Sequence, residues 1–264
     1  MNEIPYWHID AFATAPFTGN QAAVMIFEHG FPDDATMARI AAENNFAETA
    51  FLVPHAGEDA DWKLRWFTPA CEVRLCGHAT LASGHALLSR DGGDVVRFLT
   101  NKVGVLAVHR RDAGYAMALP AIATETGEFP AAVAALGAVP MATARSPDRY
   151  NIFLFDSEET VCGLRPDMAA LGALGDHQFI CTAPGSDTDV ISRVFVPGAG
   201  VDEDSVTGSA HAALTPFWAE RLGRDRFTAH QASQRGGTLT CRLDGQTAWL
   251  GGPCVTVVEG TFRY

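Results

Sequence analysis

The sequence lacks three features that would place it in a specialised class. Its six cysteines contain no C-x-x-C pair, so neither a disulfide framework nor a zinc knuckle is indicated. No stretch approaches the roughly 20 apolar residues of a membrane span, and no basic segment followed by an apolar run begins at Met1. The formal net charge of −12 disfavours a nucleic-acid partner. We therefore expect a cytoplasmic protein with neither a membrane nor a nucleic-acid partner.

A pattern that occurs twice dominates what is present. An F-x-P triplet is followed by a glycine that opens a long apolar run, first at Phe67–Pro69 and Gly77, then at Phe195–Pro197 and Gly208. The two glycines lie 131 residues apart in a chain of 264, so the period is half the sequence. Half the chain is close to the usual size of a domain. The repeat predicts two similar halves, at residues 1–123 and 124–264, with a hinge near 120–130.

Hydrophobic patterning predicts short strands around one buried helix in each half. Close spacing of the strands favours antiparallel pairing. The second buried helix contains Pro216, which removes a backbone hydrogen bond, so a kink or a later helix start is expected. The expected strands are 6–12, 22–27, 49–53, 62–67, 95–100, 104–110, 115–119, 152–155, 179–183, 190–197, 238–243, 248–250 and 255–263, and the expected helices are 33–44, 79–88, 166–174 and one that begins at 209 and stops near 222.

The two glycine-led helix starts are candidate anion sites. A helix start has unpaired backbone N–H groups and a partial positive charge, which suit a carboxylate or an oxyanion. A single glycine in this position is more often a tight turn into a core helix. The recurrence of Gly77 at Gly208 favours a shared site that faces both helix starts.

Six segments together resemble the PhzF family of phenazine-biosynthesis-like isomerases, and the resemblance covers residues 6 to about 260. They are Asp10–Phe12 (D-A-F), Pro16–Val24 (P-F-T-G-N-Q-A-A-V), Asn44–Phe51 (N-N-F-A-E-T-A-F), Arg65–Pro69, Cys76–Leu81 and Asp202–His211. The resemblance implies the diaminopimelate epimerase-like fold. This is an α+β fold of two pseudo-symmetric halves, each a curled, mostly antiparallel sheet around a central helix.

The resemblance also implies a set of site residues. The family's catalytic carboxylate falls on Glu48, and the other catalytic positions fall on His78, Asp204 and Ser209. A carboxylate that carries a proton near neutral pH needs burial to raise its pKa, and the apolar neighbours of Glu48 fit that role. Without the resemblance, Glu48 would be interpreted as a surface residue and His78 as a cap of its own helix. The predicted substrate contacts are Asn20, Gly77, Gly208, Cys76 and Thr207.

Cys76 and Thr207 leave open whether the Cys76 thiol takes part in the reaction. In the cysteine-based epimerases of this fold, a thiol precedes the glycine at both helix starts, whereas here Thr207 occupies the second position. Racemisation by two thiol bases is therefore not expected. A dehydratase or epimerase that uses Cys76 remains an alternative, and so does a non-catalytic dimer that binds small acids. Gln21 also departs from the proline of many relatives, and is expected to shape a turn.

The sequence thus predicts a cofactor-independent isomerase that moves a proton on a small carboxylic acid, with Glu48 as base and acid. The resemblance implies a homodimer. His78 and His85 are too far apart along the helix to form a two-histidine metal site, so no metal is expected. In the family's namesake the substrate is a dihydro-hydroxyanthranilate, and that substrate is not assumed for this chain.

Overall fold

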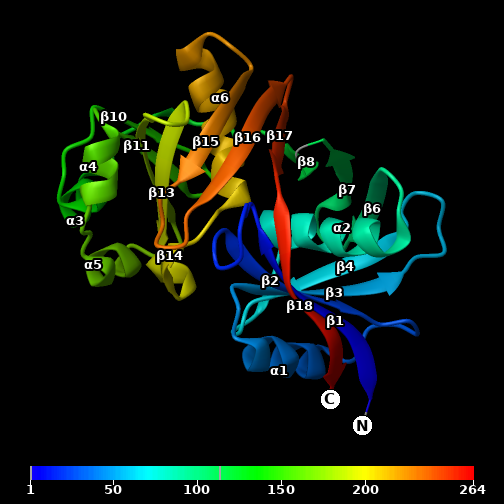
Figure 1. Ribbon diagram of the computed structural model, residues 1–264. Coiled ribbons are helices and arrows are strands. Elements are labelled where there is room, and N and C mark those ends of the chain that lie inside the picture. Colours follow the sequence, from blue (N-terminus) through cyan, green and yellow to red (C-terminus); the bar gives the residue numbers. More distant parts are fainter. Residues whose placement is uncertain (1, 113) are drawn as a thin grey trace. The chain divides into compact units, whose positions relative to one another are not determined.

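The chain forms two compact units in a computed structural model that describes residues 2–112 and 114–264 (Figure 1). Unit 1 comprises the described part of Met1–Leu119 together with Gly251–Tyr264, and unit 2 is Pro120–Leu250. The expected halves, 1–123 and 124–264, differ from these units chiefly at the C-terminal end. There, strand β18 (Cys254–Arg263) pairs antiparallel with β1 (Glu3–Ala11) and so belongs to unit 1.

Unit 1 is a curled sheet around a central helix. The strands pair in the order β18-β1-β2-β3-β4-β6-β7-β8, with the short β5 beside β4. The β2–β3 and β4–β6 pairs are parallel, and the others are antiparallel. The remaining strands are β2 (Asn20–Ile26), β3 (Glu48–Pro54), β4 (Trp62–Phe67), β5 (Glu72–Val73), β6 (Val95–Thr100), β7 (Gly104–Arg111) and β8 (Gly114–Pro120).

The central helix, α2 (Gly77–Asp91), is buried on nearly all sides because few of its side chains are charged. It packs against β1, β2, β3, β6 and β7, which lie around it (Figure 1). Gly84 lets the helix pack closely against β7, since a Cβ there would overlap the side chain of Val108. The expected helix at 79–88 is confirmed, and it begins two residues earlier than predicted.

Helix α1 (Asp34–Asn44) precedes the strand that carries Glu48. Asp33 caps its start by accepting the N–H of Thr36 at 2.8 Å, and Asn45 ends it in the left-handed conformation. Met37 and Ile40 pack in a core cluster with Phe51 of β3. The helix end and this packing fix the short segment that leads into Glu48.

Unit 2 repeats the same plan. The parallel and antiparallel sequence of β2-β3-β4-β6-β7 recurs in β11-β12-β13-β15-β16, and α6 takes the place of α2 between the short β14 and β15. The half-length repeat is therefore confirmed as a repeat of structure. The strands of this unit are β9 (Glu125–Thr126), β10 (Ala142–Arg145), β11 (Tyr150–Leu154), β12 (Gln178–Pro184), β13 (Val190–Val196), β14 (Val201–Asp204), β15 (Arg226–Gln231), β16 (Gly237–Asp244) and β17 (Thr247–Gly252).

Several elements of unit 2 were not predicted from the sequence. They include β9, β10 and β15, together with helices α3 (Pro130–Leu136) and α4 (Glu158–Gly163). The stretch 124–147, which holds β9, α3 and β10, is rich in Ala, Gly, Pro and Thr and shows little alternation of apolar and polar residues. Helix α5 (Met168–Ala173) lies inside the helix expected at 166–174, and a 3₁₀ turn follows β13 at Pro197–Ala199.

Helix α6 runs without interruption from Gly208 to Leu222, with Pro216 inside it. The expectation of a later start at this proline is wrong. Because Pro216 has no N–H, the carbonyl of Ala212 one turn earlier loses its helical donor. The N–H of Ile122 donates to that carbonyl at 3.1 Å, and this bond offsets the loss. Among the described helices, none combines the length and the apolar character needed to cross a bilayer.

Candidate active site

Four of the residues singled out in the sequence meet in unit 1. Glu48 is the first residue of β3, Asn20 is the first of β2, and Cys76 and His78 flank the glycine that starts α2. Strands β2 and β3 are parallel neighbours with Ala22 opposite Glu48, and α2 packs on β2. The strand starts and the helix start therefore converge on one place.

The imidazole of His78 is at the centre of this group and is only 4% exposed. Its Nε2 lies 3.2 Å from the carbonyl oxygen of Gln21 and 3.1 Å from Oε2 of Glu48. Its Nδ1 lies 3.1 Å from Nδ2 of Asn20 and 3.6 Å from Sγ of Cys76. The ring thus bridges a thiol and a carboxylate. The alternative interpretation of His78 as a cap of its own helix is not supported, because its ring nitrogens have these other partners.

Glu48 is held on one side and open on the other. Its side chain is 18% exposed, while its Oε2 atom is buried and has no hydrogen-bond partner among the described residues. The N–H of His78 is directed to the Gln21 carbonyl, so Oε2 has the ring as an electrostatic neighbour without an aligned hydrogen bond. A buried carboxylate oxygen without a donor is costly for stability and is a common property of a group kept for chemistry.

Burial and charge shift the titration of the two buried partners of Glu48. Burial, reinforced by the Glu48 carboxylate, raises the pKa of the Cys76 thiol to about 11. Burial alone would lower the pKa of His78, but the Cys76 sulfur and the Glu48 carboxylate outweigh it and raise that pKa above its ordinary value. The Glu48 carboxylate is therefore one of the two groups that raise the pKa of His78.

The side-chain amide of Asn20 is a hydrogen-bond partner of Nδ1 of His78, and its orientation determines which protonation state of the ring it can hydrogen-bond. As placed, the amide Nδ2 of Asn20 donates to Nδ1 of the ring, which is then an acceptor, and Nε2 carries the hydrogen. Rotation of the amide would direct its oxygen at Nδ1 and satisfy the imidazolium. The same side chain can therefore accompany His78 through gain and loss of a proton.

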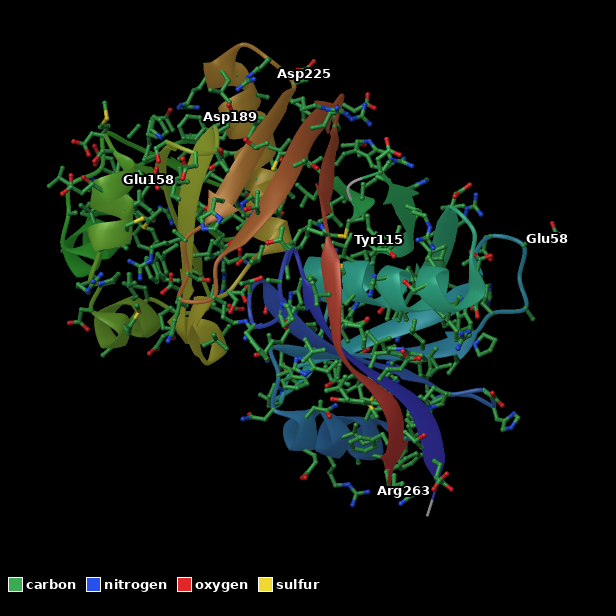
Figure 2. All side chains as sticks on the ribbon, viewed as in Figure 1. Glu58, Tyr115, Glu158, Asp189, Asp225 and Arg263 are labelled. Atoms are coloured by element: carbon green, nitrogen blue, oxygen red, sulfur yellow. The ribbon has the colours of Figure 1, made fainter. Side chains whose placement is uncertain are left out.

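Among the described residues, one cluster of side chains is close enough to hold a metal ion. It consists of Glu48, Cys76 and His78, whose ligand atoms all lie within 4.8 Å of one another. The geometry suits a chain of contacts better than a metal cage, because the sulfur faces Nδ1 and the carboxylate faces Nε2, whereas an ion would bind one nitrogen of the ring. His85 is separate from this group. It contacts the Tyr115 hydroxyl at 3.1 Å (Tyr115 is labelled in Figure 2) and Oγ1 of Thr256 at 2.8 Å.

The other predicted residues gather at the start of α6 in unit 2. Thr207 donates its hydroxyl to Oδ2 of Asp204 at 2.6 Å, and its N–H donates to Oε1 of Gln231 at 2.8 Å. The amide of Gln231 also donates to the carbonyl of Asp204 at 2.7 Å. Because this network already uses the Thr207 hydroxyl as a donor, Thr207 does not replace the missing second thiol as a base.

Ser209 contacts Gln178, a residue that was not predicted from the sequence to belong to the site. The amide Nε2 of Gln178 donates to Oγ of Ser209 at 3.1 Å. Gln178 lies 130 residues after Glu48, against 131 between the two glycines, so the half-length repeat contained a signal for it. No comparable signal pointed to Gln231, whose amide supports Asp204 and Thr207 from β15.

The glycine positions that were predicted to bind substrate do open the two central helices. Gly77 follows the cap residue Cys76, and Gly208 follows Thr207, and neither cap side chain bonds to its own helix. The first-turn N–H groups of both helices therefore lack the usual side-chain acceptor. The predicted site residues therefore form two clusters, one at the start of α2 in unit 1 and one at the start of α6 in unit 2.

Comparison with known proteins gives a consistent result. Residues 9–260 match the family described as phenazine biosynthesis-like protein. An uncharacterized isomerase of Pseudomonas aeruginosa is 42% identical over 264 residues, which cover 99% of each chain. The crystal structure of a phenazine biosynthesis PhzF-family protein of Enterococcus faecalis superposes with a TM-score of 0.92 at 38% identity, and the match covers 100% of both chains. A hydroxyproline epimerase from Agrobacterium vitis, at 14% identity and a TM-score of 0.62, covers 98% of this chain and 92% of its own and shares the fold.

Proposed function

Because this chain belongs to the phenazine biosynthesis-like (PhzC-PhzF) protein family, we propose that its isomerase activity moves a proton between two carbons of a small carboxylic acid. Glu48 takes the proton from one carbon and returns it to another. The single observation that carries this proposal is the buried Oε2 of Glu48, which has no hydrogen-bond donor among the described residues and lies 3.1 Å from Nε2 of His78.

His78 supports this role as the partner of the carboxylate. A ring 3.1 Å from Oε2 stabilises the negative charge when Glu48 is ionised, and its position above the Gln21 carbonyl keeps the ring fixed when Glu48 is protonated. Asp204 and Ser209 are proposed to serve the same reaction by binding polar groups of the substrate. The catalysis needs neither a metal nor an organic cofactor, and a homodimer in the cytoplasm remains our prediction for the assembled protein.

The alternative that depends on Cys76 is less well supported. A thiol acts as a base or nucleophile only as a thiolate, and a pKa of about 11 keeps Cys76 protonated near neutral pH. A protein that only binds small acids is also less well supported. Such a protein would gain nothing from a buried carboxylate oxygen that lacks a donor, since this group costs stability and repels an anionic ligand.

Solvent-deuterium exchange tests the proposal. A panel of small carboxylic acids, with dihydro-hydroxyanthranilate among them, is incubated with the protein in deuterated water, and exchange or isomerisation is followed by proton NMR. We expect Glu48→Gln to lower exchange by about 1,000-fold or more while binding persists. Glu43→Gln, an exposed change on α1, is the matched control and should exchange at the wild-type rate. Normal exchange in Glu48→Gln would exclude Glu48 as the base.

A further inference from the structure

The contact between Glu48 and His78 has an equivalent in unit 2. Glu48 is the first residue of β3 and contacts the second residue of α2, while Gln178 is the first residue of β12 and contacts the second residue of α6. The distance is 3.1 Å in both units, from Nε2 of His78 to Oε2 of Glu48 and from Nε2 of Gln178 to Oγ of Ser209. The repeated structure therefore places Gln178 where unit 1 has its base.

Strand register confirms that the two positions are equivalent. In unit 1, the parallel pairing of β2 with β3 begins with Ala22 opposite Glu48. In unit 2, the parallel pairing of β11 with β12 begins with Tyr150 opposite Gln178. Each residue thus opens the same ladder of its own sheet, and the correspondence does not depend on sequence similarity at the two sites.

The chemistry of the two pairs is different. A carboxylic acid and an imidazole exchange protons near neutral pH, whereas an amide and a hydroxyl exchange only hydrogen bonds. Glutamine has nearly the shape of glutamate, so the change from one unit to the other removes the charge and keeps the geometry. The Gln178 amide donates to Oγ of Ser209 at 3.1 Å, and the Ser209 hydroxyl makes only a longer contact of 3.5 Å with Oε1 of Gln178, which a carboxylate oxygen can replace.

Gln178 is held firmly enough to act in recognition. Its N–H donates to the carbonyl of Arg149 at 3.0 Å, and its carbonyl accepts from Nδ2 of Asn151 at 3.2 Å. Asn151 is only 1% exposed, so this anchor is part of the core. Gln178 itself is partly exposed, and its side chain can meet a small molecule without rearrangement of the strand.

We propose that Gln178 is a specificity-determining residue, and that with Ser209 it binds the carboxylate of the substrate at the unit 2 position equivalent to the Glu48–His78 pair. The proposal rests on the function proposed above for the identity of the substrate class. A neutral amide and hydroxyl accept an anionic group that a glutamate at the same position would repel. Gln178 therefore gives unit 2 a neutral amide and hydroxyl where unit 1 has the Glu48 carboxylate and the His78 imidazole.

The test compares a carboxylate with its neutral amide. The probes are 2-aminobenzoate and 2-aminobenzamide, whose fluorescence reports binding to the full-length protein. We expect the wild-type protein to bind 2-aminobenzoate the more tightly. Gln178→Glu should lower the affinity for 2-aminobenzoate by about 100-fold and change the affinity for 2-aminobenzamide by less than about 3-fold, because only the carboxylate probe is repelled by the new negative charge. Gln178→Leu should weaken 2-aminobenzoate by about 10-fold through loss of the amide.

Gln246→Glu adds the same charge at an exposed hairpin turn and should bind both probes like the wild type. Circular dichroism and the Tm of each variant identify any that fails to fold, in which case Gln178→Leu supplies the result. The proposal is overturned if Gln178→Glu binds 2-aminobenzoate normally, if it loses both probes equally, or if the wild-type protein binds neither. Binding of these probes does not require turnover, so this outcome is independent of exchange by Glu48→Gln.

Discussion

Nε2 of His78 lies 3.1 Å from Oε2 of Glu48, so the titration of the ring depends on the charge of the carboxylate. Since the Glu48 carboxylate helps to raise the pKa of His78, Glu48→Gln should lower that pKa. The pKa of His78 is measured by NMR of its ring nitrogens as a function of pH, in the wild type, in Glu48→Gln and in the control Glu43→Gln. An unchanged titration in Glu48→Gln would show that the carboxylate does not act on the ring.

The raised pKa of His78 also has a consequence for stability. A histidine with a folded-state pKa above its unfolded value of about 6.5 contributes stability that is fully present below that pH. The contribution is lost as pH rises through the folded-state pKa. Urea unfolding of wild type and His78→Gln should therefore differ most below pH 6.5, and the difference should shrink as pH increases.

Cys76 provides a separate prediction. Because burial raises the pKa of its thiol to about 11, Cys76→Ala should retain exchange activity within about 5-fold of wild type. At pH 8 the Cys76 thiol should react with iodoacetamide far more slowly than the exposed Cys71, as mass spectrometry of labelled peptides would show. A loss of exchange in Cys76→Ala together with normal exchange in Glu48→Gln would favour the epimerase or dehydratase alternative.

His211 should make the protein sensitive to acid. Its Nδ1–H donates to the carbonyl of Thr207 at 2.8 Å, and burial lowers its pKa to about 4. The unfolded chain binds a proton below about pH 6.5 and the folded chain does not, so the free energy of unfolding should fall by up to about 3 kcal/mol between pH 6.5 and pH 4. In His211→Asn this part of the pH dependence should disappear, whereas the exposed His29→Asn should retain it.

Arg65 and Arg193 are equivalent residues in the two units, and they should differ in their response to lysine. Each arginine forms a bidentate pair with a glutamate, Arg193 with Glu203 and Arg65 with Glu72. Arg193 also donates to the carbonyl of Leu164 at 2.9 Å, whereas the additional partner of Arg65 is Asp34, whose side chain is 77% exposed. Lysine cannot reproduce the fork of donors. Arg193→Lys should lower the free energy of unfolding by about 2 kcal/mol, and Arg65→Lys by about 1 kcal/mol, in urea titrations.

The features of the fold that repeat were predictable from the sequence. The two apolar runs behind Gly77 and Gly208 identified the central helices because a helix without a charged face must be surrounded by its own unit. Strand β18 was also predicted as a strand, but its partner was not. Pairing with β1 joins residues more than 240 positions apart, and local alternation contains no information about the partner of a strand.

The candidate site was predictable in part. The resemblance identified Glu48 and His78, and the structure brings them into contact through the start of a parallel strand and a helix start. The support of that contact by Asn20 and the carbonyl of Gln21 could not be inferred, since it depends on the register of β2. Gln178 was missed because an isolated glutamine has no characteristic pattern; its spacing of 130 residues from Glu48 was a signal, but it is the strand register that shows the equivalence.

The pairing of β18 with β1 also has a consequence for the order of folding. Unit 2 is continuous in the sequence, whereas unit 1 needs a strand that leaves the ribosome after all of unit 2. We therefore expect unit 2 to fold first during synthesis, while the edge of β1 that later pairs with β18 remains unpaired. Interruption of translation before residue 254 would release a chain whose later half is folded and whose earlier half still exposes that edge.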